Sequence, residues 1–239
     1  MRKVVFINPL FFIGAGMNKT AQLALSVQLP DDETFESYLS ESNNSVVGQL
    51  ALFIDNSVQA QSTQPNSFYL FGLAGVGKSH LLHASSAYAS QLGKTSVCLS
   101  CAELLALPVA VLEGLEQINV ICLDDIQLLR DNQLWQQAVF DLYNRVLEQN
   151  NCLLISGDQS VAQLGLTLPD LISRLSWGLT EQLKPLSDAE KVIALQYRAS
   201  KRGLMLSDEA ANFLLNRSSR EMKNLITSLD QLDKASIRE

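Results

Sequence analysis

A glycine-rich segment of eight residues constrains the fold of this chain more than any other feature. The segment GLAGVGKS, from Gly72 to Ser79, fits the pattern G-x-x-x-x-G-K-[ST] and lies between an apolar run, FYLFG, and a helix-forming run, LLHASSAYASQ. In this context the glycines let backbone N–H groups surround a phosphate, and the helix N-terminus favours the anion. The sequence therefore predicts a strand, a phosphate-binding loop (P-loop) and a helix.

Side chains in and around the P-loop have separate expected tasks. Lys78 is expected to neutralise phosphate charge and the Ser79 hydroxyl to ligate Mg²⁺. Tyr38 and Leu39, which precede the core, are expected close to the base. The nucleotide contacts predicted on the loop itself are Gly72, Gly75, Val76, Gly77, Lys78, Ser79 and His80. We expect the purified protein to hold a nucleoside diphosphate there.

Acidic residues follow two further apolar runs. VICLDD ends in Asp124 and Asp125, which suit Mg²⁺ binding and the orientation of an attacking water, respectively. NCLLISGD ends in Asp158, which we expect near the γ-phosphate. The alternatives are a capped strand end for the acidic pair and a Gly-Asp turn for Asp158.

Arg174 is the candidate residue that acts on another molecule. It lies in LISRLSWGLTEQLKPL, far in sequence from the P-loop, and is free to serve the nucleotide of another subunit. A surface ion-pair residue is the alternative interpretation.

Apolar runs alternate with helical stretches through the middle of the chain. This pattern predicts a parallel sheet covered by helices on both faces. The longest stretch, 132–149, places Leu134, Ala138, Leu142 and Val146 on one stripe, and an earlier helix starts at Val46. After Lys184 only helical patterns occur, at 188–201, 208–216 and 219–235, which predicts a helical lid. The apolar runs are 68–72, 95–99, 119–125, 151–156 and 178–183.

Composition restricts the partners. The 239 residues are 47% apolar and carry a net charge of -7, which disfavours nucleic acid and acidic membrane surfaces as partners. Cys122 and Cys152 lie in strand-like runs and are expected to be core thiols, whereas CLSC (Cys98 and Cys101) is compatible with metal or redox chemistry but lacks a second ligand pair. His80 and His83 are expected to pack against their surroundings without an acidic or thiol partner. Reduced cysteines favour a cytoplasmic protein.

The N-terminal region is expected to have two parts. Residues 1–16 begin with a charged and apolar stretch that we interpret as an upstream extension before a start at Met17, with a signal peptide as the alternative. The resulting division is an N-terminal arm at 17–45, a nucleotide-binding core at 46–184 and a lid at 185–239.

The motifs together resemble a known family. GLAGVGKSHLLHA, VICLDDIQ, NCLLISGD, SRLSWGLTEQLKPL and REMKNLITSLDQLDKASI resemble the AAA+ core of the DnaA-related family, over about residues 31 to 237. LPDDETFESYL, LWQQAVFDLYNR and the lack of a DNA-binding domain after the lid are similar to the short Hda-like members. The resemblance implies an α/β core with five parallel strands, a small α-helical lid and ADP at their junction.

The resemblance also implies a function. Hda-like members bind the sliding clamp of DNA polymerase III through an arm peptide, matched here by Gln22, Leu23 and Leu25, while Ala24, Ser26 and Val27 depart from its form. Such a protein oligomerises, contacts DNA only indirectly and supplies its arginine, here Arg174, to trigger ATP hydrolysis by DnaA. Its own ATPase is weak or absent. The clamp-binding residues predicted in this way are Gln22, Leu23, Leu25 and Val27.

The sequence departs from the family at one lid position, and it leaves three alternative functions open. Lys223 stands where the lid of the family presents an arginine to the phosphates, and a lysine lacks the planar fork of donors. An ATPase that acts as a loader or remodeller would use Asp124 and Asp125 itself. A DnaA-like initiator fragment is disfavoured by the negative charge, and a small-molecule kinase would need an acceptor pocket.

Overall fold

A five-stranded parallel sheet forms the centre of the molecule. We describe a computed structural model, in which residues 33–56, 66–217 and 221–236 are described. The sheet order is β2-β3-β4-β1-β5, and all pairings are parallel, as predicted. The inner strands are apolar on both faces because helices cover both sides of the sheet. The strands are β1 (Ser67–Phe71), β2 (Ser96–Ser100), β3 (Val120–Asp124), β4 (Cys152–Gly157) and β5 (Leu179–Gln182).

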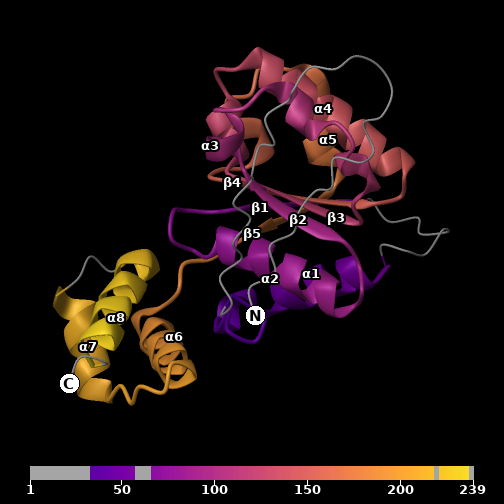
Figure 1. Ribbon diagram of the computed structural model, residues 1–239. Coiled ribbons are helices and arrows are strands. Elements are labelled where there is room, and N and C mark those ends of the chain that lie inside the picture. Colours follow the sequence, from indigo (N-terminus) through magenta and orange to yellow (C-terminus); the bar gives the residue numbers. More distant parts are fainter. Residues whose placement is uncertain (1–32, 57–65, 218–220, 237–239) are drawn as a thin grey trace, which may run out of the picture.

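Helices form two layers around this sheet (Figure 1). Alternate residues of β1 divide the core: Phe68 and Leu70 join the apolar cluster on the side of α1 and α2, and Tyr69 joins the cluster on the side of α4 and α5. The helices of the core are α1 (Asn44–Asn56), α2 (Lys78–Gln91), α3 (Cys101–Leu104), α4 (Gln133–Glu148) and α5 (Pro169–Trp177). Short 3-10 turns lie at Glu41–Asn43, Val109–Leu112, Leu115–Gln117, Ile126–Leu129 and Val161–Gln163.

The buried stripe of α4 differs from the predicted one. Leu142 and Val146 are buried as expected, but Leu134 is 66% exposed, and Trp135 and Val139 take the inner positions instead. Steps of four residues advance a helix by roughly 400°, so a stripe built only from such steps drifts by about 40° each time. The predicted stripe therefore leaves the buried face toward its N-terminal end.

The lid is a separate three-helix unit with a small core of its own. It contains α6 (Asp188–Lys201), α7 (Asp208–Arg217) and α8 (Met222–Ser236), close to the predicted ranges. A capping box begins α6, in which Ser187 accepts from the backbone of Glu190 and Glu190 accepts from the backbone of Ser187. Leu195, Leu215 and Leu225 fill the centre.

The positions of the four cysteines test the expectations of core thiols and of a CLSC site. Cys122 and Cys152 are fully buried, which confirms them as core thiols. Cys98 packs with the cluster on the α2 side and Cys101 with the cluster on the α4 side, so CLSC does not converge on one site.

Within residues 33–56, 66–217 and 221–236, no helix has the length and apolar character needed to cross a membrane.

Candidate nucleotide-binding site

The P-loop joins β1 to α2 at the carboxyl end of the sheet. Gly75 and Gly77 have φ angles of +79° and +94°, values that side chains with a Cβ rarely adopt. A Cβ on Gly77 would also lie 2.6 Å from the ring of Tyr38. Lys78 begins α2, so the unpaired N–H groups of the first helical turn face the loop. The loop thus has the backbone that a phosphate-binding turn needs.

Tyr38 braces this loop from the arm. Its hydroxyl donates to the carbonyl of Val76 at 2.9 Å and accepts from Asn43 Nδ2 at 3.2 Å. Burial raises the pKa of Tyr38, so the hydroxyl stays protonated and able to donate. Leu39 is half-buried beside it. Tyr38 therefore lies at the P-loop, and from Glu33 onward the arm packs against the core.

Asn43 joins the arm to the end of the sheet. Its side chain is fully buried and exchanges two hydrogen bonds with the backbone of Lys184, both 2.9 Å long. The sequence analysis missed this residue, because one polar residue in a polar segment has no local signal. Its burial becomes visible only when residues 141 positions apart are brought together.

Lys78 and Ser79 occupy the positions predicted for phosphate and metal contacts. Lys78 is 8% exposed, and its Nζ donates to the carbonyls of Gly72 and Leu73 at 2.8 and 3.2 Å. These neutral acceptors hold the ammonium at the loop without cancelling its charge. Ser79 is exposed at the start of α2, where its hydroxyl is accessible. Both groups are available to an anionic ligand and its cation.

Asp124 and Asp125 are held at the carboxyl end of β3 by Ser156 of β4. Ser156 Oγ donates to Asp124 Oδ1 and accepts from the backbone N–H of Asp125 at 2.9 Å. Asp125 adopts a φ of +61°, and its Oδ1 accepts from Gln127 Nε2 at 2.9 Å. Ser156, which the sequence analysis missed, therefore holds the Asp124 carboxylate and the Asp125 backbone, while Gln127 holds the Asp125 carboxylate.

The oxygen donors at this edge fit Mg²⁺. The ion takes one or two carboxylates together with hydroxyl, water and phosphate oxygens and needs no cage of protein ligands. Asp124 supplies a carboxylate of which Ser156 engages one oxygen, and Ser79 supplies a hydroxyl. Among the residues that the structure describes, no group of three His, Cys, Asp or Glu side chains could hold a metal by itself. A metal at this site would therefore depend on the nucleotide.

Only one of the two carboxylate oxygens of Asp158 has a partner among the described residues. Its Oδ2 lies 3.5 Å from Arg130 NH2, while its Oδ1 is buried without a hydrogen-bond partner in the described part of the chain. The residue follows β4 at the same edge of the sheet as Asp124. An uncompensated carboxylate oxygen at this edge is available to a polar ligand group or a water.

The two histidines that follow the P-loop have partners that the sequence analysis did not expect. The expectation of no acidic or thiol partner is wrong for His83, because Glu33 Oε2 lies 2.5 Å from His83 Nδ1. Burial lowers the pKa of His83, but hydrogen bonds with Cys98 and Glu33 outweigh it and raise the pKa to about 10. His80, predicted as a nucleotide contact, faces the arm and the lid. Glu33 is 50 residues from His83, so no local pattern reveals the pair.

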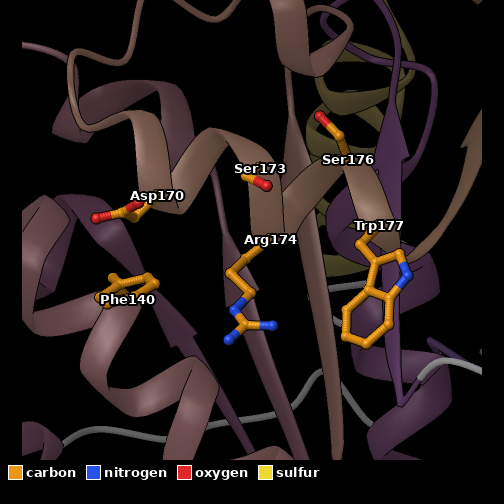
Figure 2. Close-up of a pocket in the computed structure, with 6 residues that line it drawn as sticks. All are labelled: Phe140, Asp170, Ser173, Arg174, Ser176 and Trp177. Atoms are coloured by element: carbon orange, nitrogen blue, oxygen red, sulfur yellow. The ribbon is translucent and has the colours of Figure 1, made fainter.

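Arg174 lies on the outside of the core, in α5. Its guanidinium carbon is 5.8 Å from the ring centroid of Trp177, itself 66% exposed, and Figure 2 shows the side chain between Trp177 and Phe140. No carboxylate of the described residues lies within ion-pair distance of it. The surface hollow around it measures about 620 Å³ and is also lined by Asp170, Ser173 and Ser176.

Arg174 and the P-loop lie at opposite ends of the strands. The carbonyl of Arg174 accepts from Tyr143 Oη at 2.9 Å, and that hydroxyl lies 2.6 Å from Ser67 Oγ. Ser67 is the first residue of β1, whereas the P-loop follows the last residue, Phe71. At roughly 3.3 Å per residue, β1 alone separates the two by about 13 Å. The structure therefore does not bring Arg174 to its own nucleotide site.

Some predicted site residues cannot be placed. Gln22, Leu23, Leu25 and Val27 lie outside the described residues. Lys223 lies near the start of α8, and only its backbone position is described.

Comparison with known proteins identifies the family of the core. A model of the bacterial DnaA ATPase domain matches residues 29–182. The chain belongs to the bacterial DnaA ATPase family. A model of the Hda lid domain matches residues 188–239. These matches make the chain an Hda- and DnaA-like AAA+ protein with a nucleotide-binding core, as the motifs indicate.

Solved DnaA structures share this fold. Domain III of DnaA from Thermotoga maritima is 21% identical, with a TM-score of 0.73 over 89% of this chain and 93% of that one. AMPPCP-bound DnaA from Aquifex aeolicus is 20% identical, with a TM-score of 0.67 over 84% and 66%. A replication initiator DnaA bound to AMPPCP and single-stranded DNA is 18% identical, with a TM-score of 0.67 over 85% of this chain. This chain spans 65% of the length of that initiator.

Proposed function

We propose that this protein is a negative regulator of replication initiation that activates ATP hydrolysis by DnaA. In the proposed state it carries ADP and Mg²⁺ in its own P-loop and is bound to the DNA-loaded sliding clamp of DNA polymerase III. It then docks on ATP-bound DnaA and inserts Arg174 into the ATP site of the DnaA AAA+ domain. The active species is a homo-oligomer in the cytoplasm, and its contact with DNA is indirect, through the clamp.

The position and surroundings of Arg174 carry this proposal. The guanidinium is at the outer surface of α5 and is not neutralised by an ion pair with any described residue. Its backbone is linked through Tyr143 to the amino end of β1, away from its own P-loop. A cation in this position serves a nucleotide only when that nucleotide belongs to another molecule.

The chemistry of such an arginine explains the expected effect. A guanidinium stabilises the negative charge that develops on the transferring phosphoryl group, and its planar fork can bridge two oxygens. Arginine fingers accelerate hydrolysis by about 10³ to 10⁵, which is about 4 to 7 kcal/mol of barrier. An exposed ion pair contributes only about 0 to 1 kcal/mol. The two roles of Arg174 therefore predict outcomes that differ by orders of magnitude.

The test is a reconstituted hydrolysis assay. DnaA, ATP, clamp loaded on DNA and this protein are combined, and the ADP formed per DnaA is measured. Arg174→Ala is expected to lose the stimulation by a factor of 10³ or more. The matched control is Arg217→Ala, because Arg217 also lies over an aromatic ring, Phe213 at 5.2 Å, but in the lid. Wild-type stimulation by Arg174→Ala would contradict the proposal.

Turnover by the isolated protein separates this function from the main rival. The proposal expects little ATP hydrolysis without DnaA, because the protein carries ADP in its own P-loop and Arg174 acts on the ATP that DnaA binds. Rapid hydrolysis by the protein alone would indicate a loader or remodeller that uses Asp124 and Asp125 for its own ATP.

A further inference from the structure

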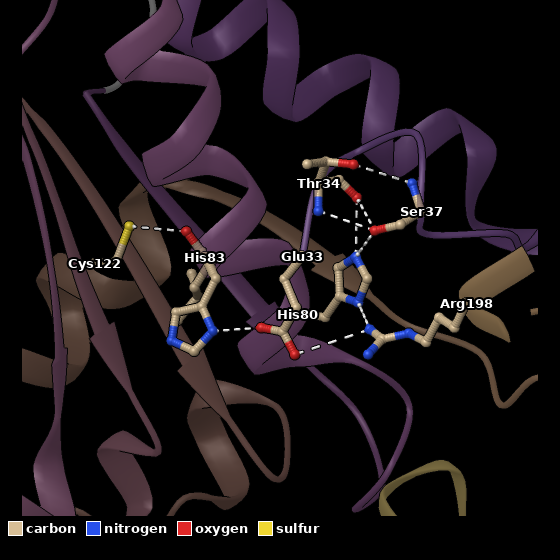
Figure 3. A network of polar contacts seen from close by, with 8 residues as sticks. Glu33, Thr34, Ser37, His80, His83, Cys122 and Arg198 are labelled. Carbon is tan, nitrogen blue, oxygen red and sulfur yellow. Dashed lines mark hydrogen bonds and ion pairs between the residues drawn. The ribbon is translucent and has the colours of Figure 1, made fainter. Parts of the chain in front are cut away.

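Three segments that are distant in the sequence meet beside the first turn of α2 (Figure 3). Arg198 of the lid helix α6 places its NH2 3.0 Å from His80 Nδ1 and 3.9 Å from Glu33 Oε1. His80 Nε2 lies 2.9 Å from the carbonyl of Thr34 and 3.1 Å from Ser37 Oγ. One imidazole thus joins the lid, the P-loop helix and the arm.

The donors and acceptors define the state of this imidazole. A guanidinium has only donors, so His80 Nδ1 must accept from Arg198. The proton of a neutral imidazole is then on Nε2, which donates to the carbonyl of Thr34. His80 therefore connects the arm to the lid, because one ring nitrogen donates to the arm and the other accepts from the lid.

Arg198, His80 and Glu33 together form a junction between the lid, the P-loop helix and the arm. Glu33 supplies its negative charge. Its Oε2 contacts His83 Nδ1 at 2.5 Å and its Oε1 faces Arg198. Burial raises the pKa of Glu33, but the hydrogen bond with His83 and the electrostatic interactions with His80, His83 and Arg198 outweigh it and lower the pKa. The carboxylate is ionised and lies between cations of α2 and α6. Because Arg198 is 6% exposed, its charge requires this compensation.

We propose that Arg198 is a positioning residue that holds the lid on the nucleotide site, with Glu33 as its counter-charge and His80 as its anchor. The inference rests on nucleotide binding by the P-loop, as proposed above. His80 immediately follows Ser79, so the junction sits against the turn of α2 expected to hold the phosphates. While the junction is formed, the lid stays closed and nucleotide leaves slowly. When the junction opens, the lid swings away and nucleotide leaves faster.

A second arginine of the same lid gives the matched control. Arg202, one helical turn after Arg198, pairs with Asp230 at 2.5 Å, and both residues belong to the lid. Removing it breaks this ion pair within the lid. Arg198→Met and Arg202→Met each remove one charge from neighbouring positions, but only the first disconnects the lid from the P-loop helix.

The experiment measures how fast a fluorescent ADP analogue leaves the full-length protein. Arg198→Met is expected to raise the dissociation rate about tenfold or more, while Arg202→Met stays within about twofold of wild type. Arg198→Lys is expected to restore only part of the retention, since an ammonium keeps the charge opposite Glu33 but lacks the planar NH2 group that contacts both Glu33 and His80. Misfolding would reduce the amplitude of the signal and not the dissociation rate of the molecules that bind.

The possible results distinguish a failure of the proposed junction from a failure of the proposed nucleotide site. An unchanged dissociation rate in folded Arg198→Met would overturn the junction alone, whereas absence of binding by wild type would overturn both the junction and the proposed nucleotide site. If Arg198→Met does not fold, Glu33→Gln takes its place, because it removes the charge at nearly constant volume. It is expected to raise the dissociation rate severalfold, and no change in it would equally overturn the inference.

Discussion

The two ends of the parallel sheet are built differently. At the carboxyl end, Lys78, Asp124 and Asp125 are each held by hydrogen bonds from their own chain. At the amino end, Arg174 has an aromatic neighbour but no ion pair among the described residues. The first arrangement preorganises a ligand site within the molecule, and the second leaves a cation available to a partner. From this difference we expect that mutations can separate the proposed nucleotide binding from the proposed activation of DnaA.

The largest expected effect separates the two ends. Lys78→Ala is expected to abolish nucleotide retention, because Lys78 is the only cation within the P-loop sequence. The measurement is the nucleotide content of purified protein by chromatography after denaturation. Undiminished content would show that the loop does not hold the phosphates.

The next effect tests the backbone of the carboxyl end. Gly77→Ala and Gly75→Ala both place a Cβ at positive φ, which costs about 1 to 2 kcal/mol. Only the Gly77 variant also clashes with Tyr38, since the space around Gly75 is open. Thermal unfolding should therefore show a larger loss of stability for Gly77→Ala. Equal losses would mean that Tyr38 does not brace the loop.

At the amino end of the sheet, replacing Trp177 is expected to have a smaller effect on the stimulation of DnaA. Trp177→Ala removes the ring beside Arg174, and an exposed cation–π contact contributes about 0.5 to 1 kcal/mol. We expect roughly a two- to fivefold loss of DnaA stimulation, with unchanged nucleotide content. Trp177→Phe keeps an aromatic face and should restore part of the activity. Full activity in the Ala variant would mean that Trp177 does not orient Arg174.

The last prediction concerns a pH dependence of stability beside the carboxyl end. The pKa of His83 is raised to about 10, so its contribution is complete below the ordinary value of about 6.5 and is lost as pH rises toward 10. The pKa of Glu33 is lowered, so its contribution is lost as pH falls through that lowered value. The difference in melting temperature between wild type and His83→Gln should be largest near pH 5 to 6 and shrink toward pH 10. A difference that grows with pH would contradict the pairing.

Local patterns predicted most of the fold. The P-loop, the five strands and the three lid helices follow from short-range periodicity and from turn chemistry, which need no knowledge of distant residues. The face of α4 was misassigned, because steps of four residues drift around a helix and the sheet decides which face is buried.

The candidate site was only half predictable. Lys78, Asp124 and Asp125 belong to motifs whose spacing is diagnostic. Ser156 and Asn43 orient those motifs, but each is an ordinary polar residue until tertiary contacts bury it. The Glu33–His83 pair likewise joins positions 50 residues apart. Residues that position others carry no pattern in the sequence, whereas the residues predicted to contact the ligand do.

The most direct test of the separation between the two ends uses one preparation of Arg174→Ala and two readouts. The nucleotide content of the protein reports on the carboxyl end, and the ADP formed per DnaA in the presence of DNA-loaded clamp reports on the amino end. We predict wild-type nucleotide content together with a loss of stimulation of at least 10³. A parallel fall of both readouts would contradict it, because Arg174 would then serve its own nucleotide site.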